Sequence, residues 1–374
     1  MSAGRPDLPR WAEIGLLPLA NVLLAFIVAG LIVLVIGENP LDAVRIMLVG
    51  SLGNAEALGY TLYYTTNYIF TGLAVAIAFH AGLFNIGGEG QAYIGGLGVG
   101  LLLLGLDRYL PWEVLAPLAV LAALLFGAAW ALIPAYLQAY RGSHIVITTI
   151  MFNFLASSLM VYLMVNVLNR RGATNPESRE IAPSARLPFI HDLLAGIGIT
   201  IPDTPLNLSI LLALLAAAFV WVYVWHTPWG YELRTVGQSE RAAVYAGVKP
   251  RRVVLATLLI SGGLAGLVGV NEIMGVQHRL LLNFNAGYGF TGIAVALMGR
   301  SHPFGVVLAS LLFGILTQGG AELAFEMPNI DNDMVTVIQG LVILFSGALA
   351  HLSRPWLEAL FMLLARRGRT LRQA

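Results

Sequence analysis

Long apolar runs separated by short polar segments dominate the pattern of this chain. A helix needs about 20 apolar residues to cross the hydrocarbon core of a bilayer. The pattern predicts an all-α, polytopic transmembrane helix bundle of about ten helices. The expected spans are Ile14–Gly37, Tyr60–Phe79, Ala92–Leu106, Val114–Tyr136, Ile145–Leu168, Asn207–His226, Val253–Gly275, Tyr288–Met298, Pro303–Ala321 and Met334–Ala350.

Two of these runs, Ala92–Leu106 and Tyr288–Met298, are short for a full crossing, and both adjoin Gly-rich sequence. We therefore expect broken or re-entrant segments at these places. The first run, Ile14–Gly37, is too long for the apolar region of a signal peptide, and no small-x-small cleavage pattern follows it. We expect it to be retained as the first span.

Composition supports a membrane protein. Hydrophobic residues make up 58% of the 374 residues and charged residues only 11%, whereas a soluble domain carries about 25%. The 41 glycines suit helix contacts in lipid, where small residues allow close backbone approach. A net charge of +1 gives no reason to expect a nucleic-acid partner, and the lack of cysteine excludes disulfides and thiol chemistry.

The distribution of Lys and Arg predicts the orientation. With both termini in the cytoplasm, about two thirds of the 21 Lys and Arg residues fall on the inside, as the positive-inside rule requires. Two longer polar segments then separate the membrane spans. Residues 169–205 form an extracytoplasmic loop, either a passive connector or a docking surface, and residues 227–252 form a cytoplasmic loop.

No motif for ATP hydrolysis, metal binding or nucleophilic catalysis is present. A phosphate-binding loop needs Gly-Lys-Ser/Thr, but the single lysine, Lys249, precedes a proline. The sequence predicts a transport subunit that is not an enzyme and has no cofactor. Its energy must come from a partner or from an ion gradient.

Polar residues within the apolar pattern mark a candidate substrate path. Asn85, Glu89 and Gln91 lie among glycines that permit a broken helix, and a buried acidic residue needs a partner or water. Glu89 has structural alternatives: it could cap a helix N-terminus at the cytoplasmic boundary, or accept bonds from backbone amides freed by the break.

A second polar site lies near the outer end of its span, at Asn271 and Glu272. Both residues are further candidates for the path, and an interfacial position is the alternative. Asn153 completes the candidate set, although an interhelical hydrogen bond is its more ordinary role. His80 and His278 flank spans and are not expected to relay protons.

The inside loop carries the pattern of a short surface helix. Ser239 can cap a helix from Ser239 to Ala246, which Gly247 would end. Such a helix between two spans is suited to docking a soluble subunit, and an ordinary solvated loop is the alternative. The candidate coupling residues are Glu240, Arg241, Ala242, Ala243, Tyr245 and Gly247.

One short segment occurs almost twice. The heptapeptide at 70–76, Phe-Thr-Gly-Leu-Ala-Val-Ala, returns at 290–296 with isoleucine in place of leucine. Duplicated halves are common in transporters, and chance matches in a small apolar alphabet are the alternative.

These motifs resemble a known family. Ala242-Ala243-x3-Gly247, followed by Ser261-Gly262 and Ala265-Gly266, resembles the coupling-helix region of ABC importer permeases. The segments 84–91 and 289–297 resemble permeases for ribose-like sugars and branched-chain amino acids, and especially the nucleoside branch that works with basic-membrane-protein lipoproteins. The similarity covers nearly the whole chain. Arg241 departs from the importer pattern, in which an acidic residue often precedes the two alanines.

The resemblance implies one transmembrane permease domain over residues 1–374 in the bacterial cytoplasmic (inner) membrane. The implied partners are a cytoplasmic ABC ATPase, a second related permease as a heterodimer, an extracytoplasmic substrate-binding lipoprotein and the lipid bilayer. The expected cargo is a nucleoside or a related small polar solute such as a simple sugar. An ion-coupled secondary transporter, with Glu89 or Glu272 as its ion site, is the alternative.

Overall fold

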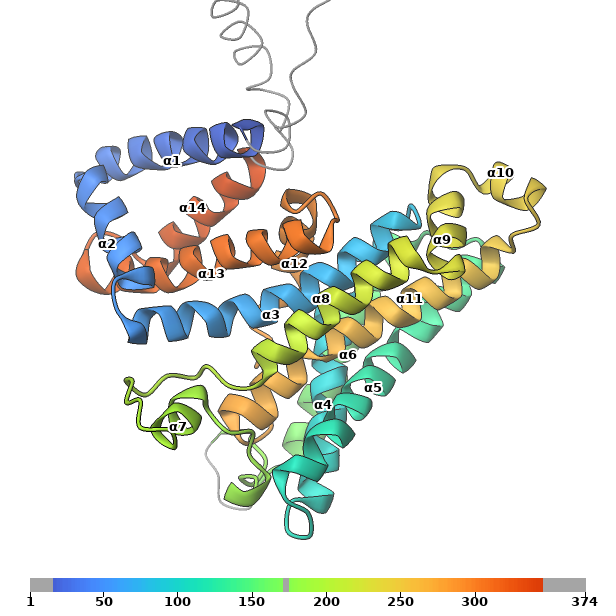
Figure 1. Ribbon diagram of the computed structural model, residues 1–374, viewed down its shortest axis with the longest axis horizontal. Coiled ribbons are helices and arrows are strands. Elements are labelled where there is room, and N and C mark those ends of the chain that lie inside the picture. Colours follow the sequence, from blue (N-terminus) through green and yellow to red (C-terminus); the bar gives the residue numbers. More distant parts are fainter. Residues whose placement is uncertain (1–15, 171–174, 346–374) are drawn as a thin grey trace, which may run out of the picture. The chain divides into compact units, whose positions relative to one another are not determined.

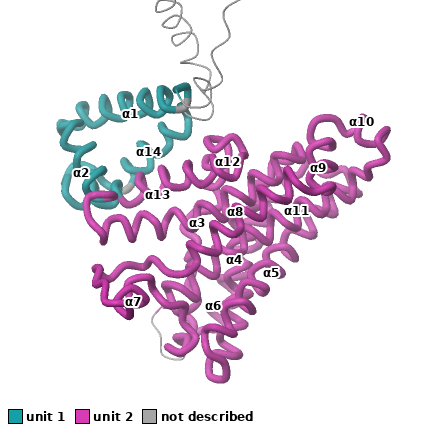
Figure 2. Tube along the Cα trace, in the orientation of Figure 1, with its two compact units in different colours: residues 1–50, 319–374 teal, residues 51–318 magenta. Residues whose placement is uncertain are grey.

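The computed structural model describes residues 16–170 and 175–345, which are helical throughout apart from connecting segments and two isolated β-bridges. Contacts divide the chain into two compact units (Figure 2). Unit 1 comprises residues 1–50 and 319–374, and unit 2 comprises residues 51–318. The all-α prediction is confirmed.

Unit 2 holds most of the helices (Figure 1). They are α3 (Ala55–His80), α4 (Gly88–Leu106), α5 (Trp112–Arg141), α6 (Ile145–Asn166), the 3-10 turn η2 (Pro183–Ala185), α7 (Ile190–Ala195), α8 (Ser209–His226), α9 (Pro228–Gln238), α10 (Glu240–Tyr245), α11 (Pro250–Gly266), the π-helix η3 (Val270–Gln277), α12 (Tyr288–Met298) and most of α13 (Pro303–Glu326).

Unit 1 holds α1 (Leu17–Ile36), α2 (Pro40–Leu52), α14 (Asn332–Ile343) and the end of α13. Helix α2 packs closely on α13, because a side chain added at Gly319 would collide with the backbone of Met47. Asn329 donates a 2.9 Å hydrogen bond to Glu38 across the same unit.

Eight helices in the described part of the chain are long and apolar enough to span a bilayer, with α11 and η3 counted as one span. Two shorter apolar helices, α12 and nearly all of α14, accompany them. Eight of the ten predicted spans are therefore confirmed as long enough to cross, among them Ala92–Leu106, which was expected to be short or broken but belongs to the 19-residue helix α4. Tyr288–Met298 has the predicted bounds. Residues 14–15 and 346–350 of two predicted spans lie outside the described residues.

Some helices were not predicted. Helices α2, α7 and α9 lie in segments that the apolar pattern left as connections. The pattern missed them because helices at a surface need no long apolar run. Helix α4 also begins earlier than expected, at Gly88, so the break between α3 and α4 covers residues 81–87.

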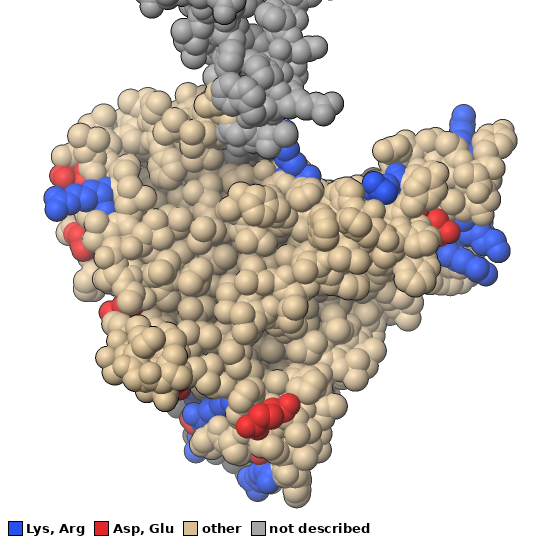
Figure 3. Space-filling model, in the orientation of Figure 1, with Lys and Arg blue, Asp and Glu red and all other residues tan. Residues whose placement is uncertain are grey.

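Unit 2 has two opposite ends. The α10 end holds His80, Trp225 and α10: the His80 and Trp225 rings lie 5.1 Å apart, and Gly237 packs on the His80 backbone. The Arg179 end holds Asp107, Arg179 and Arg279. In Figure 3 the charged side chains of unit 2 gather towards these ends, and the surface of the long helices between them is almost free of charge. This distribution suits a bilayer around the middle of the unit.

Small residues allow α4, α5 and α11 to pack with their backbones almost touching. A side chain added at Gly95 would collide with Gly266 of α11, and one added at Gly127 would collide with Gly262. The two copies of the repeated heptapeptide also face each other, since Gly72 of α3 accommodates Val295 of α12. These contacts explain the many glycines as helix-packing residues.

Candidate functional site

A re-entrant segment, His278–Gly287, interrupts the helical bundle between the two ends of unit 2. It follows η3 at the Arg179 end and leads into α12. Helix α12 ends close to the α10 end, where the Ser301 carbonyl lies 2.9 Å from His80 Nε2. Its 11 residues extend about 16 Å, and the 19 residues of α4, which lead from the same place to the Arg179 end, extend about 28 Å. Helix α12 therefore begins inside unit 2, nearer the α10 end than the Arg179 end.

Glu89 caps the N-terminus of α12. Its carboxylate accepts hydrogen bonds from Asn285 Nδ2 at 2.7 Å and from the backbone N–H groups of Gly287 at 3.0 Å and Gly289 at 2.8 Å. A helix that starts inside the membrane leaves N–H groups that water cannot satisfy. The negative charge also complements the positive end of the helix dipole. Glu89 therefore stabilises the break between the re-entrant segment and α12.

The same face of α4 holds the rest of the re-entrant segment. We call Glu89, Tyr93, Gly96 and Gly100 the α4 face, since residues at these spacings lie on one side of a helix. The Tyr93 hydroxyl accepts a 2.8 Å hydrogen bond from the backbone N–H of Asn283. The two glycines leave room for side chains of the segment: Phe284 lies against Gly96 and Leu280 against Gly100.

The re-entrant segment contains unusual backbone conformations. His278, Asn283 and Ala286 have φ values of 53°, 57° and 43°. A left-handed conformation is costly for residues other than glycine and persists only where the surroundings impose it. Here the α4 face holds Asn283 and the two neighbours of Ala286, whereas the His278 carbonyl accepts a 2.8 Å hydrogen bond from the Ile181 N–H.

The predicted residues Asn85 and Gln91 tie the break before α4 to its neighbours. Both are buried, with 1% and 2% of their surface exposed. Asn85 Nδ2 donates to Gln91 Oε1 at 3.0 Å and to Ser261 Oγ of α11 at 2.9 Å. Ser261 in turn donates to the Ala74 carbonyl of α3 at 2.6 Å. The amide groups thus join α3, α4 and α11.

Asn153 of α6 holds the same break from the other side. Its Nδ2 donates to the Ile86 carbonyl and its Oδ1 accepts from the Gly90 N–H, both at 2.9 Å. This confirms that Asn153 makes interhelical hydrogen bonds.

Asn271 and Glu272 form a second buried network, in η3. Glu272 Oε1 accepts 2.6 Å hydrogen bonds from the Tyr63 hydroxyl and from Asn67 Nδ2 of α3. Asn271 donates to Asn67 Oδ1 at 2.9 Å and accepts from Ser209 at 2.6 Å. Both residues are only 1% exposed, so their side chains are enclosed by protein. The π-helix turns both side chains towards α3 and the start of α8.

Part of the candidate extracytoplasmic loop packs against the re-entrant segment. We call Glu177–Leu187 the strap. Its backbone runs along residues 274–281: Ser178 N–H donates to the Leu280 carbonyl at 3.1 Å, and Leu187 N–H donates to the Met274 carbonyl at 3.1 Å. The strap therefore packs against the end of η3 and the start of the re-entrant segment.

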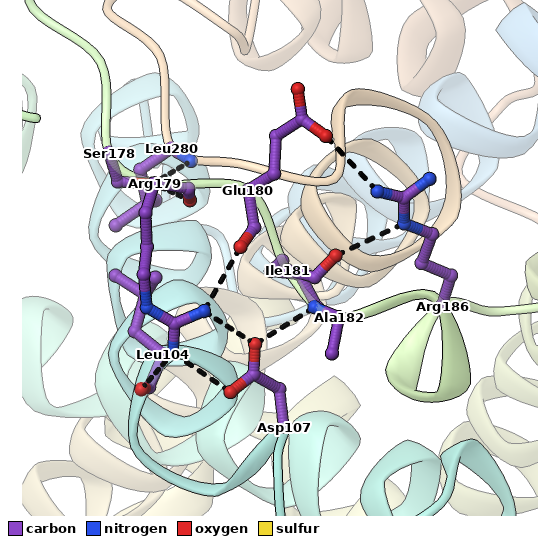
Figure 4. A network of polar contacts seen from close by, with 9 residues as sticks. All are labelled: Leu104, Asp107, Ser178, Arg179, Glu180, Ile181, Ala182, Arg186 and Leu280. Atoms are coloured by element: carbon purple, nitrogen blue, oxygen red, sulfur yellow. Dashed lines mark hydrogen bonds and ion pairs between the residues drawn. The ribbon is translucent and has the colours of Figure 1, made fainter.

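An ion pair fastens the strap to the end of α4 (Figure 4). Arg179 makes two hydrogen bonds to the Asp107 carboxylate, at 2.7 and 2.8 Å, and one to the Leu104 carbonyl at 2.6 Å. Asp107 also accepts from the Ala182 N–H at 2.9 Å. The Arg179 hydrogen bonds hold the pKa of Asp107 below its usual value.

The predicted coupling helix is present as α10, with nearly the predicted bounds. Ser239 Oγ accepts from the Ala242 N–H at 3.3 Å, and Gly247 has a φ of 80°, as a helix end requires. Tyr245 is 94% exposed and Val244 is 57% exposed. Ala243, by contrast, is fully buried, so its side chain cannot contact a docked subunit without a rearrangement. In Figure 1, α10 lies at the tip of unit 2.

Sequence reasoning expected a broken or re-entrant segment at Tyr288–Met298 but did not identify residues 278–287 as that segment, and it missed the Asp107–Arg179 pair. Asn283 and Asn285, close before Gly287 in a gap between apolar runs, were the available signal for the segment. The ion pair gave no local signal, since 72 residues separate its partners.

Comparisons with known proteins agree over most of the chain. Residues 57–347 match the family described as branched-chain amino acid transport system, permease component. The chain is 36% identical to a glucose ABC transporter permease of Haloferax volcanii, over 91% of this chain and 89% of the relative. It is 35% identical to a guanosine ABC transporter permease of Bacillus subtilis, over 88% and 92%. It is 30% identical to a nucleoside ABC transporter permease of Lactococcus lactis, over 88% and 90%. The chain therefore belongs to this permease family and is a multi-pass membrane subunit of an ABC transporter, not an enzyme.

Proposed function

We propose that the chain is the permease subunit of an importer for nucleosides or related small polar solutes such as simple sugars. The observation that carries this proposal is the likeness, over about nine tenths of the chain, to permeases named for glucose, guanosine and nucleosides. These solutes share a sugar ring with several hydroxyl groups. Family membership favours ATP-driven transport over the ion-coupled alternative.

We further propose that α10 docks a cytoplasmic ABC ATPase. Its exposed residues Glu240, Arg241, Ala242, Val244 and Tyr245 form the contact. Ala243 supports the helix from below, and Gly247 ends it. ATP-driven movement of the ATPase would then shift α9 and α10 and, through Gly237 packed on His80, the α10 end of α3.

The α10 end faces the cytoplasm in this proposal. Both termini are then cytoplasmic, the membrane is the bacterial inner membrane, and both compact units belong to one permease domain. The Arg179 end faces outward, where residues 169–205 would receive a substrate-binding lipoprotein. A second, related permease would complete the importer.

The solute path is proposed to run beside the re-entrant segment. Glu89 is half-buried there, and Asn85, Gln91, Asn153, Asn271 and Glu272 are buried behind it. These residues would border the path as a supporting layer that keeps the break and the segment in place. Contacts with the cargo would be made by more exposed groups.

Reconstitution into liposomes with the ATPase, the second permease and the binding protein tests the proposal. We expect uptake of guanosine or glucose that requires ATP and survives an uncoupler. Uptake that follows the proton gradient without ATP would contradict the coupling, and ATP-dependent uptake of neither solute would contradict the cargo.

A double variant, Val244→Ala with Tyr245→Ala, tests the docking surface. Because both side chains are exposed, insertion and thermal stability should be unchanged while solute-stimulated ATP hydrolysis falls. Tyr109→Ala, 80% exposed at the Arg179 end, is the control. Normal stimulation in the double variant would contradict docking through α10.

A further inference from the structure

Part of the re-entrant segment exposes polar groups that have no partner in the described chain. The side chain of Asn283 is exposed, and its carboxamide makes no hydrogen bond with the described residues. Ala286 is also exposed, and its carbonyl accepts no hydrogen bond from any residue that the structure describes. The neighbouring polar groups differ, because Asn285 and Gly287 both donate to Glu89.

The depth of these groups restricts what they can face. Irregular backbone at membrane depth is tolerated only where it is buried in protein or lines a water-filled cavity, since lipid cannot satisfy its polar groups. Asn283 and Ala286 are exposed next to the start of α12, between the two charged ends of unit 2. Both also adopt left-handed conformations, with φ values of 57° and 43°, and such strain is concentrated at functional sites.

The charges nearby exclude some ligands. From Leu280 to Gly299 the sequence contains no Lys, Arg or His. Arg279, just before, is paired with Glu177 at 3.1 Å. The Glu89 carboxylate already accepts three hydrogen bonds. A solute carboxylate or phosphate would lose its hydration here without gaining a cation, whereas hydroxyl groups could use a carboxamide and a carbonyl.

We propose that Asn283 and the backbone carbonyl of Ala286 hydrogen-bond the hydroxyl groups of the sugar ring of the cargo as it passes the re-entrant segment. This inference rests on the proposed function. It adds the groups that contact the cargo and the chemical class of cargo that they select. Neutral polyhydroxylated rings pass, and zwitterionic amino acids do not. A few neutral hydrogen bonds suit a transporter, because each contributes only about 0.5–1.5 kcal/mol and permits release.

Cysteine accessibility tests the site, since the natural chain has no cysteine. In the assembled transporter, Ala286→Cys should react with a charged, membrane-impermeant thiosulfonate, and guanosine or glucose with binding protein should slow the reaction. Leu215→Cys, at a 67% exposed position of α8, should face lipid and not react. An unreactive Cys at 286 would place this surface against another subunit and overturn the inference, as would reaction without protection by either solute.

Uptake rates provide a second measurement. Asn283→Ala should lower uptake of guanosine about 2- to 10-fold, as expected for one neutral hydrogen bond, and should have little effect on 2′,3′-dideoxyguanosine. Asn166→Ala, exposed at the end of α6 and outside the loop proposed to receive the binding protein, is the matched control. An equal reduction for both solutes, or no reduction for either, would overturn the inference. The proposed function would still stand in that case if the wild type imports guanosine or glucose. If the wild type imports neither nucleosides nor sugars, both fail.

Discussion

The Glu89 carboxylate on α4 accepts a 2.8 Å hydrogen bond from the backbone N–H of Gly289, in the first turn of α12. A side chain from one helix thereby caps another that starts inside the membrane. The alternative in which Glu89 caps a helix N-terminus is therefore confirmed, and the capped helix is α12.

Glu89→Gln should destabilise the protein by about 1–3 kcal/mol. Glutamine has a single acceptor oxygen, and its NH2 group would face the N–H donors of Gly287 or Gly289. Thermal unfolding in detergent measures the effect, with Glu113→Gln, exposed at the start of α5, as the control. Unchanged stability together with lost transport would show that the charge acts in the path itself.

Gly96→Ala should loosen the re-entrant segment. The added methyl group would collide with the Phe284 ring, and overpacking of this kind costs about 1–3 kcal/mol. Gly105→Ala is a matched control in the same helix, because nothing lies within 4 Å of its added carbon. Thermal unfolding compares the two variants.

A compensating change strengthens this test. Phe284→Leu removes the ring that lies against Gly96, so the double variant with Gly96→Ala should recover part of the lost stability. If Gly96→Ala behaves like Gly105→Ala, the segment is not seated on the α4 face.

Arg179→Ala should release the strap. Asp107 is 1% exposed, so its carboxylate would remain buried without a cation at a cost of about 1–3 kcal/mol. Arg186→Ala removes a more exposed pair with Glu180, at 3.3 Å, and should cost about 0–1 kcal/mol. Limited proteolysis of residues 175–208 measures the release, and equal cleavage of the two variants would contradict it.

The sequence by itself determined the membrane class, the order of the spans and the position of α10. Each depends on local information: apolar runs longer than a bilayer crossing, Ser239 as a cap, and Gly247 as a helix end. Short apolar length also marked Tyr288–Met298 as a helix that does not cross.

Only the tertiary structure decided which polar residues act together. The pairing of Glu89 with Asn285 joins residues 196 positions apart, and that of Tyr63 with Glu272 joins residues 209 apart. Local pattern could show that each polar residue in lipid needs a partner, but not which partner it has. That choice depends on how α4, α11 and the re-entrant segment pack, and the packing depends on glycines such as Gly96 and Gly266, whose role is visible only when another backbone or side chain lies against them.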